Sequence, residues 1–326
     1  MEKRRIMAIA LCITMAGAAL TGCGNSDGMV ATTSLETSPK NEQGDTPAPP
    51  ASVEAPKEKA EQEPVKETTP AVEVSAPKPA SASIEEAVIL DQNGIKVTAK
   101  NLEDSLYGPS VTLLIENDSG QDLTFQARNV SVNGYMVGSM FSCDVVNGKK
   151  ANDSLTIMNT DLEKAQISTI ADIEFSLHVF DSESWDAVID TDPIRLVTSA
   201  AAGYNYTYDD SGDLAYDGNG VKIVVKGQSE NDSIFGPGII LYLENYGDKG
   251  VTVQTRDVSI NGFMISPMFS CDLPVGKHAI DAITFMSSDL ESNSIEKITD
   301  VELSFHVFTM EGWDMVVDTD TVTIHF

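Results

Sequence analysis

The sequence predicts an all-β protein in which two tandem antiparallel β-sandwiches follow a long segment without regular structure. Three observations predict this fold. A stretch of 91 residues occurs twice, because residues 107–197 align without a gap with residues 235–325, and 42 positions are identical. Within each copy apolar and polar residues alternate, and Asn-Gly pairs separate the alternating runs. So many identities at one constant offset mean that the chain carries one structural unit twice.

The alternation is clearest in residues 129–144 and in their copy, residues 257–272. A strand sends successive side chains to opposite faces of a sheet, so this pattern indicates a half-buried strand. Met136 and Met264 take the outward parity and are candidate binding residues at an apolar edge. The inward parity, and with it a place in the core, falls to Tyr135, Val137, Phe141, Cys143 and Val145 and to Phe263, Ile265, Phe269, Cys271 and Leu273.

Upstream of these strands the parity of the apolar residues changes near Arg128 and near Arg256. A β-bulge at each point would keep the apolar residues on both sides of it in the core. Because bulges re-aim side chains, we predict that Arg128 and Arg256 are exposed binding residues. An ion pair with Glu116 or Glu244 is the alternative.

Turn signals divide each copy into seven or eight short strands. The Asn-Gly pairs at 133–134 and 261–262 tolerate the positive φ angles of a type I′ hairpin turn, and residues 161–170 predict one or two helical turns. So many short strands in about 110 residues indicate a sandwich of immunoglobulin-like topology. In the first copy we expect strands at 88–90, 95–99, 111–116, 123–132, 135–145, 155–158, 173–180 and 187–197.

A short motif follows the repeated strand in both copies. Residues 146–149 and 274–277 each end in Gly-Lys and lead into a strand, at 155–157 and 283–285. With this motif the repeats resemble the small immunoglobulin-like domains, sometimes called telokin-like, of Firmicutes surface lipoproteins. The resemblance implies a β-sandwich and no particular activity, and the cysteine pair of antibody domains is missing.

The first 23 residues have the pattern of a secretory signal. Three basic residues, Lys3, Arg4 and Arg5, precede an apolar run that is too short to span a bilayer comfortably. The run closes with Leu-Thr-Gly-Cys, which resembles the lipobox of bacterial lipoproteins. This resemblance implies cleavage before Cys23 and a lipid on its thiol, and it places the protein on the extracytoplasmic face of a cell membrane. An uncut or plain secretory signal is the alternative.

The remaining boundaries follow from composition. Residues 24–83 hold 9 of the 14 prolines and no aromatic residue, so this segment is predicted to be a disordered tether. All Phe, Tyr and Trp residues come later. The predicted division is therefore a signal at 1–23, a tether at 24–83, a first repeat at 84–199, a connector at 200–213 and a second repeat at 214–326.

The strong acidity of the chain limits its partners. Its formal net charge is −29, which repels nucleic acid and anionic lipid head groups. Neither is therefore an expected ligand. Divalent cations or basic partners would be attracted, but we favour the plainer explanation that the charge belongs to a well-solvated secreted surface.

Aspartates recur along the last strand of each repeat. Those of equal parity form a row on one face, about 7 Å apart, and would suit a calcium ion if loop oxygens joined them. We favour a solvated strand face as the explanation of these rows and keep the calcium site as the alternative. The rows are Asp186, Asp190 and Asp192 in the first repeat and Asp314, Asp318 and Asp320 in the second.

The residues that could support catalysis do not converge in the predicted fold. His178 and His306 take the outward parity, whereas Cys143 and Cys271 take the inward one, so no Cys–His pair is expected. No zinc-type cluster of His and Cys occurs either. Trp185 and Trp313 are expected as core or edge packing residues. We therefore expect no enzymatic activity, and an envelope hydrolase is the least favoured function.

Two functions remain from these patterns. The first is a lipid-anchored surface protein that displays two immunoglobulin-like sandwiches as a non-catalytic binding or adhesion module, with a cell-envelope glycan or a surface protein as its ligand. The second is an accessory subunit that docks on a membrane partner such as a transporter, receptor or secretion complex. Two copies of a site would permit avidity toward a repetitive target.

Overall fold

The computed structural model describes residues 82–326. The predicted signal, the lipid site at Cys23 and nearly all of the predicted tether lie outside the described residues. Within residues 82–326 the chain is built from antiparallel strands and two short helices, α1 (Asn159–Lys164) and α2 (Ser287–Ser292). No helix in this part of the chain is long and apolar enough to cross a membrane. The all-β prediction is confirmed, and both repeats belong to one compact unit.

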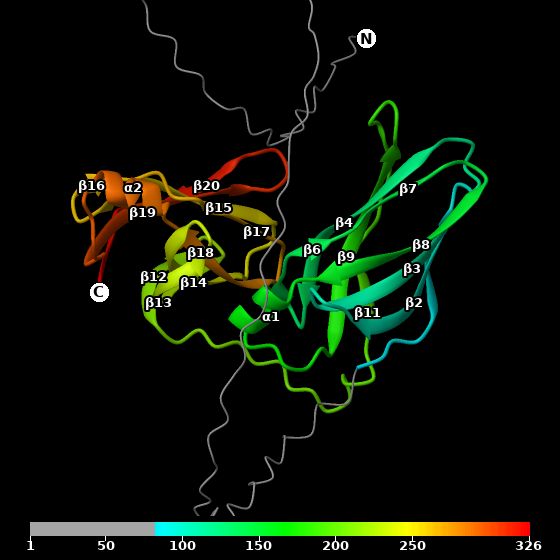
Figure 1. Ribbon diagram of the computed structural model, residues 1–326, viewed down its shortest axis with the longest axis horizontal. Helices are drawn as coiled ribbons and strands as arrows, with labels where there is room; N and C mark the ends of the chain where they lie inside the picture. Colours follow the sequence, from blue (N-terminus) through cyan, green and yellow to red (C-terminus); the bar gives the residue numbers. More distant parts are fainter. Residues whose placement is uncertain (1–81) are drawn as a thin grey trace, which may run out of the picture. The chain divides into compact units, whose positions relative to one another are not determined.

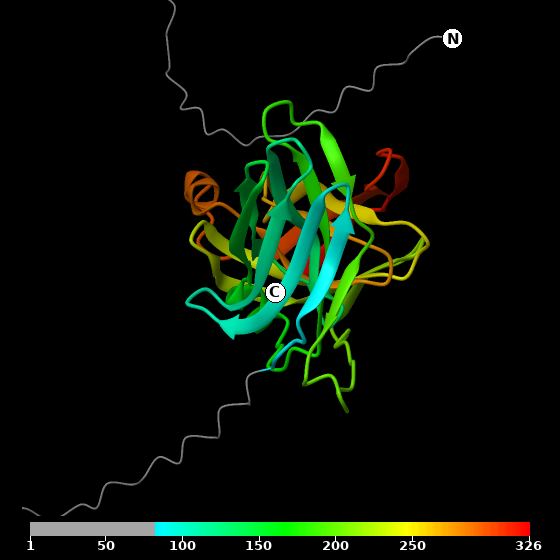
Figure 2. The same cartoon turned by 90° about the vertical axis from the view of Figure 1, so that its right-hand side faces the viewer.

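The first repeat is a sandwich of two sheets. Figure 2 views it from the side of the first sheet, with the cyan strands in front. In order across that sheet lie β1 (Ala87–Gln92), β2 (Ile95–Asp104), β3 (Pro109–Asn117), β8 (Lys149–Ile157) and β6 (Ser139–Met140). The second sheet holds β10 (Ala187–Asp190), β9 (Asp172–Asp181), β4 (Leu123–Val132) and β5 (Tyr135–Met136), with β11 (Ile194–Val197) paired to β9 and β7 (Ser142–Val145) paired to β4.

The second repeat has the same order of strands (Figure 1). Its first sheet contains β12 (Asp213–Gly218), β13 (Val221–Ser233), β14 (Gly236–Asn245) and β18 (His278–Thr284). Its second sheet contains β16 (Phe263–Met264), β15 (Val251–Ile260), β19 (Asp300–Thr309) and β20 (Met315–Asp318), with β17 (Ser270–Leu273) paired to β15 and β21 (Val322–His325) paired to β19. Each repeat therefore contains two layers of strands, and one layer of each repeat belongs to a sheet that continues into the other repeat.

The predicted bulges and turns are present in both copies. The pairing of β4 with β9 shifts between Arg128 and Ser131, and the pairing of β15 with β19 shifts between Arg256 and Ser259. In both Asn-Gly turns, 133–134 and 261–262, each residue has a positive φ, as a type I′ turn requires. Helix α1 begins two residues before the predicted helical turns.

Two apolar cores result from the alternation. Phe125 and Phe175 meet Leu113 in the first repeat, and the corresponding residues of the second repeat form a separate cluster. Cys143 and Cys271 lie in these cores as free thiols, as their parity predicts. Burial raises the pKa of the Cys143 thiol to about 11 and also raises that of Cys271, because the charged thiolate is poorly solvated there.

We therefore expect both core thiols to be chemically inert in the folded protein. A chain of residues 82–326 at pH 8 should react with a thiol reagent only as fast as it unfolds, and should show two reactive thiols in denaturant. Colorimetric thiol titration with and without urea measures this directly. Fast labelling of the native chain would contradict the buried placement.

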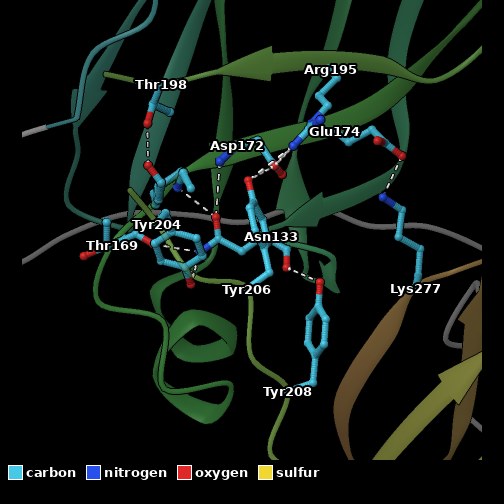
Figure 3. Close-up of polar contacts among 12 residues, drawn as sticks. Asn133, Thr169, Asp172, Glu174, Arg195, Thr198, Tyr204, Tyr206, Tyr208 and Lys277 are labelled. Carbon is cyan, nitrogen blue, oxygen red and sulfur yellow. Dashed lines mark hydrogen bonds and ion pairs between the residues drawn. The ribbon is translucent and has the colours of Figure 1, made fainter. Parts of the chain in front are cut away.

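The two repeats are joined by a polar and aromatic junction (Figure 3). The connector passes Tyr204, Tyr206 and Tyr208 over the Asn133-Gly134 turn of the first repeat. The Asn133 side chain donates to the Thr169 carbonyl (2.7 Å) and to the Tyr204 hydroxyl (2.9 Å), and it accepts from two backbone N–H groups, those of Ala171 (2.8 Å) and Asp172 (3.2 Å). The connector is thus an ordered part of the fold.

Charged side chains reinforce this junction. Asp172 is buried and accepts hydrogen bonds from Arg195 and from the Tyr206 hydroxyl. Lys277 of the second repeat and Glu174 of the first form an ion pair at 2.6 Å, with both side chains largely shielded from solvent. A single pair of residues, His278 and Tyr135, also joins β18 to β5 in parallel, so one sheet runs through both repeats.

Packing at the two hairpin ends departs from the predictions at three residues. Tyr135 is buried as predicted, yet it packs in a cluster between the repeats rather than in the first core. Met136, predicted to face outward, is partly buried against the core of the second repeat. Phe263, the counterpart of Tyr135, was predicted to be in the core and is 46% exposed. The physical reason is that β18 and the connector cover the first hairpin, whereas no described residue covers the second in the same way.

His278 is the buried histidine of the junction. Its ring stacks on Tyr208 at a centroid distance of 3.6 Å, and its Nδ1 lies 2.8 Å from the Tyr242 hydroxyl. Burial lowers the pKa of His278, the nearby Lys277 lowers it further, and Glu244 opposes both. The folded junction therefore favours the neutral imidazole.

We expect the protein to lose stability as the pH falls through the ordinary histidine value of about 6.5. Below a pH of about 6.5 the histidine of the unfolded chain becomes protonated, whereas His278 in the folded protein stays neutral. The free energy of unfolding therefore falls by up to about 1.4 kcal/mol per pH unit. Urea unfolding of the wild type and of His278→Asn between pH 5 and pH 8 isolates this contribution. Identical pH slopes in the two proteins would contradict it.

Candidate ligand-binding strips

Five side chains line up on the outer face of the second sheet in each repeat. We call this row the Arg–Asp–His–Phe–Trp strip. Strand β9 supplies His and Phe, which point away from the core, β4 supplies Arg, β10 supplies Asp, and the β9–β10 turn supplies Trp. The strip consists of Arg128, Asp190, His178, Phe180 and Trp185 in the first repeat and of Arg256, Asp318, His306, Phe308 and Trp313 in the second.

The polar end of each strip is a hydrogen-bonded ion cluster. His178 Nδ1 lies 2.5 Å from Asp190 Oδ1, and Arg128 Nη1 lies 4.0 Å from the same oxygen. In the second repeat His306 and Asp318 are also 2.5 Å apart, and Arg256 Nη1 is 3.3 Å from Asp318. The arginine and aspartate side chains are about half exposed, so they retain free hydrogen-bonding capacity toward a ligand.

The aromatic end is a stack with one open face. Phe180 is buried beneath Trp185, with ring centroids 5.4 Å apart and an angle of 17° between the planes. Phe308 and Trp313 stack in the same way at 5.3 Å and 16°. Trp185 is nevertheless 72% exposed and Trp313 76% exposed. Each indole ring is therefore held flat against the sheet and presents its other face to solvent.

The backbone at both tryptophans is unusual. Trp185 has φ 65° and Trp313 has φ 60°, in the left-handed region that bulky residues rarely adopt. The Trp185 N–H donates to the Asp181 carbonyl at 2.9 Å, which closes the turn. Such a conformation costs about 1–2 kcal/mol for a residue with a Cβ, and Gly or Asn would fit the turn better. Both copies hold Trp in this strained position.

The structure corrects the placement of the tryptophans, which were expected as core or edge packing residues. It brings the predicted Arg128 and Arg256 together with Asp190 and Asp318, and not with Glu116, which pairs instead with Lys150. Met264 is 68% exposed and belongs to the second hairpin, away from the strip's sequence segments.

The two aspartate rows do not assemble. A register shift between Ala187 and Ile189 breaks the assumed parity, so Asp186 lies in the turn and Asp190 pairs with His178. The shift between Val307 and Phe308 does the same to Asp314 and Asp318, and Asp192 and Asp320 follow the ends of their strands. Residues 82–326 contain no group of three or more His, Cys, Asp or Glu side chains placed to hold a metal ion. These rows therefore do not form the alternative calcium site.

The strip was missed as a unit because its parts come from four segments. One signal pointed to it: all five residue types are identical in the two repeats, although fewer than half of the aligned positions are. What this arrangement can do is hold a flat ligand on an aromatic face and hydrogen-bond its edge. Among the described residues, no serine or cysteine is hydrogen-bonded to His178 or His306.

Comparison with known proteins adds little to this geometry. No family model and no curated protein matches the chain. Among solved structures the chain is similar to the crystal structure of the YadV chaperone, with 11% sequence identity over 72% of this chain and 100% of that one. The TM-score of 0.22 is too low for this likeness to carry an argument.

Proposed function

We propose that this chain is a non-catalytic binding module, lipid-anchored through Cys23 at the outer face of a cell membrane, whose two strips bind cell-envelope glycan. The observation that carries the proposal is the pair of exposed tryptophans, each fixed on a buried phenylalanine beside an Arg–Asp–His cluster. Aromatic rings that are large and rigid lose little entropy on binding, which makes them effective anchors.

The chemistry of the strip fits a sugar chain. The C–H faces of a sugar ring are flat and apolar, so they can stack on the open face of an indole. The hydroxyl groups at the ring edge need both donors and acceptors, and Arg128 and Asp190 supply one of each. The outer face of β9 from the level of Arg128 to that of Phe180 spans about 14 Å, enough for a short oligosaccharide.

The charge of the chain narrows the class of glycan. Residues 84–198 carry a net charge of −12 and residues 199–326 one of −14, so a polyanionic polymer would be repelled. The favoured ligand is therefore a neutral or amine-bearing polysaccharide. Two strips on one chain raise the overall affinity for a repetitive polymer if both can engage it at once.

The strand order supports an immunoglobulin-like class for each repeat. One sheet has β2, β3 and β8 as neighbours, and the other has β7, β4, β9 and β11. These correspond to strands A, B and E and to strands C′, C, F and G of that fold. The absence of catalysis is part of the proposal, supported by raised thiol pKa values and by histidines paired to aspartate rather than to a nucleophile.

An accessory subunit of a membrane complex is the second candidate. The exposed Phe263 and Met264 at the edge of the second repeat favour it, because apolar pairs of this kind suit a protein partner. This surface is separate from the strips in the sequence, so the two functions are compatible.

Binding of a soluble chain of residues 82–326 to separated envelope fractions tests the proposal. We expect saturable binding to neutral wall polysaccharide that persists when calcium is chelated. Replacing Arg128 and Arg256 by Gln should weaken binding by about fivefold per site, the value of roughly one hydrogen bond. Binding confined to membrane proteins would instead support the accessory-subunit function, and strict dependence on calcium would contradict the assignment of the strips.

A further inference from the structure

The two repeats share a docking edge that is occupied in only one of them. In the first repeat the edge is the hairpin end formed by residues 133–136. The Gly134 carbonyl accepts the backbone N–H of His278 at 3.0 Å, and the Asn133 carbonyl accepts the Tyr208 hydroxyl at 3.2 Å. Tyr135 packs edge-on against Tyr208, with ring centroids 5.3 Å apart. The connector and the second repeat together cover this edge of the first repeat.

The second repeat builds the same edge from residues 261–264. Its Asn-Gly turn has φ angles of 51° and 84°, against 51° and 87° in the first. The Asn261 side chain again donates to a carbonyl, that of Lys297, at 2.7 Å, and accepts the backbone N–H groups of Thr299 and Asp300 at 3.0 and 3.1 Å. The local scaffold of the docking edge is therefore retained.

Within residues 82–326 nothing covers this second edge. Phe263 is 46% exposed and Met264 is 68% exposed. A Cβ placed on Gly262 would meet no atom within 4 Å, whereas one on Gly134 would lie 2.5 Å from the Tyr208 hydroxyl oxygen. The carbonyls of Asn261 and Gly262, whose counterparts accept hydrogen bonds from the connector and from β18, receive none from the described residues. The edge is open, apolar and ready to accept hydrogen bonds.

The contacts at the occupied edge of the first repeat indicate which kind of segment the open edge of the second repeat would bind. The connector presents tyrosines at alternate positions, 204, 206 and 208, and they reach Asn133 and Asp172. The second repeat keeps both partners as Asn261 and Asp300, and Asp300 is already hydrogen-bonded to Thr299 and His325, which leaves part of its carboxylate exposed. It also keeps the acidic residue that pairs with Lys277, since Glu302 stands in place of Glu174 and is exposed. An extended segment with alternate tyrosines and a nearby basic residue would satisfy these groups.

This chain does not itself supply such a segment. Residues 1–83 contain no tyrosine, and the only Tyr-x-Tyr-x-Tyr sequence, in the connector, is already held by the first repeat. The outer face of the first repeat also lacks the matching surface. It has Lys150 and Leu114 where the second repeat has His278 and Tyr242. A second copy of the chain therefore offers no equivalent of the surface that covers the first edge.

We propose that the edge formed by residues 261–264 is a docking site for a partner protein, which it holds through an extended, tyrosine-bearing segment in the way that the first repeat holds the connector. The site is distinct from the two Arg–Asp–His–Phe–Trp strips, and its occupant is a polypeptide rather than a glycan.

A synthetic peptide with the connector sequence of residues 203–210, labelled with a fluorophore, is the probe. Titrated with the full chain, its anisotropy should report one binding site per chain with a dissociation constant below 1 mM, the limit that we set for detection. The peptide will not displace the tethered connector from the first repeat, because the connector acts at a high effective concentration. Replacing the three peptide tyrosines by Ala should abolish binding.

Single-residue variants of the chain test whether the peptide binds at the edge formed by residues 261–264. Phe263→Ser and Met264→Lys change exposed side chains, so both proteins should fold normally and bind the peptide at least tenfold more weakly. Asn261→Ala should do the same, and Leu106→Ala, which alters an exposed apolar residue elsewhere, should not. Trp185→Ala with Trp313→Ala should leave peptide binding intact, which separates this site from the strips. No saturable binding, binding unchanged by Phe263→Ser, or a chain dimer that Phe263→Ser dissolves would each overturn the proposal.

Discussion

Replacing both tryptophans by alanine should abolish glycan binding and leave the fold intact. Aromatic anchor residues that a ligand covers contribute about 2 kcal/mol or more to binding, so each single variant should weaken its own site by at least about 30-fold. The double variant also loses the avidity between the two strips, so its binding should fall below detection. Isothermal titration with the purified polysaccharide measures both steps.

Matched variants keep this result interpretable. Trp185→Phe with Trp313→Phe retains a stacking face and should preserve part of the affinity. Leu106→Ala removes another exposed apolar side chain, 86% accessible, and should bind like the wild type. Thermal unfolding of the double Ala variant should show only a small loss of stability, because each indole is mostly exposed and contributes chiefly its stacking contact with Phe180 or Phe308. Undiminished binding by the double Ala variant would remove the strips from consideration.

Replacing Asn133 by alanine should destabilise the protein by at least about 3 kcal/mol. The substitution deletes four side-chain hydrogen bonds in a nearly inaccessible position and leaves the N–H groups of Ala171 and Asp172 buried without an acceptor. Each such orphaned group costs about 1–3 kcal/mol. Alanine at φ 51° adds about 1–2 kcal/mol more.

The second copy provides the control for that prediction. Asn261→Ala breaks equivalent bonds, but the site is exposed and water can replace the lost acceptor. We expect Asn261→Ala to lower the free energy of unfolding by at least about 2 kcal/mol less than Asn133→Ala does. This difference is the contribution of burial at the junction. Urea unfolding of both variants gives the comparison. Equal losses would show that the connector does not shield the first turn.

The local architecture could be predicted from the sequence because its signals are local. Alternation placed β4 at its observed bounds, and the change of parity at Arg128 revealed a bulge before any pairing was known. The repeat doubled the information, since each strand could be recognised twice. Strand periodicity depends only on neighbouring residues in the sequence, so a strand can be recognised without knowing which strands pair with it.

Burial at the ends of the repeats could not be predicted in that way. Tyr135 and Phe263 occupy the same position in the same motif, yet one is 6% exposed and the other 46%. The difference lies in what packs on them. A signal for the junction was present in positions where the copies differ, because His278, Tyr242 and Val224 replace Lys150, Leu114 and Thr98 on an outer sheet face.

The strips depended on features that periodicity does not contain. The register shift in β10 decides which aspartate meets His178, and a bulge of this kind has no distinctive residue. The tryptophans were expected as core or edge packing residues. The left-handed backbone conformation that exposes them is ordinarily marked by Gly or Asn, so the sequence carried no sign of it. The identity of all five strip residues in both repeats was the one sign available.

Intrinsic fluorescence tests the central assignment most directly, because Trp185 and Trp313 are the only tryptophans in the chain and one lies in each strip. Titration of the folded chain with the neutral envelope polysaccharide should shift the emission to shorter wavelength and protect it from acrylamide quenching as sugar rings cover the open indole faces. Each single Trp→Phe variant should report the remaining strip alone. Saturable binding of the polysaccharide that leaves emission and quenching unchanged would contradict the assignment of the strips as the binding sites.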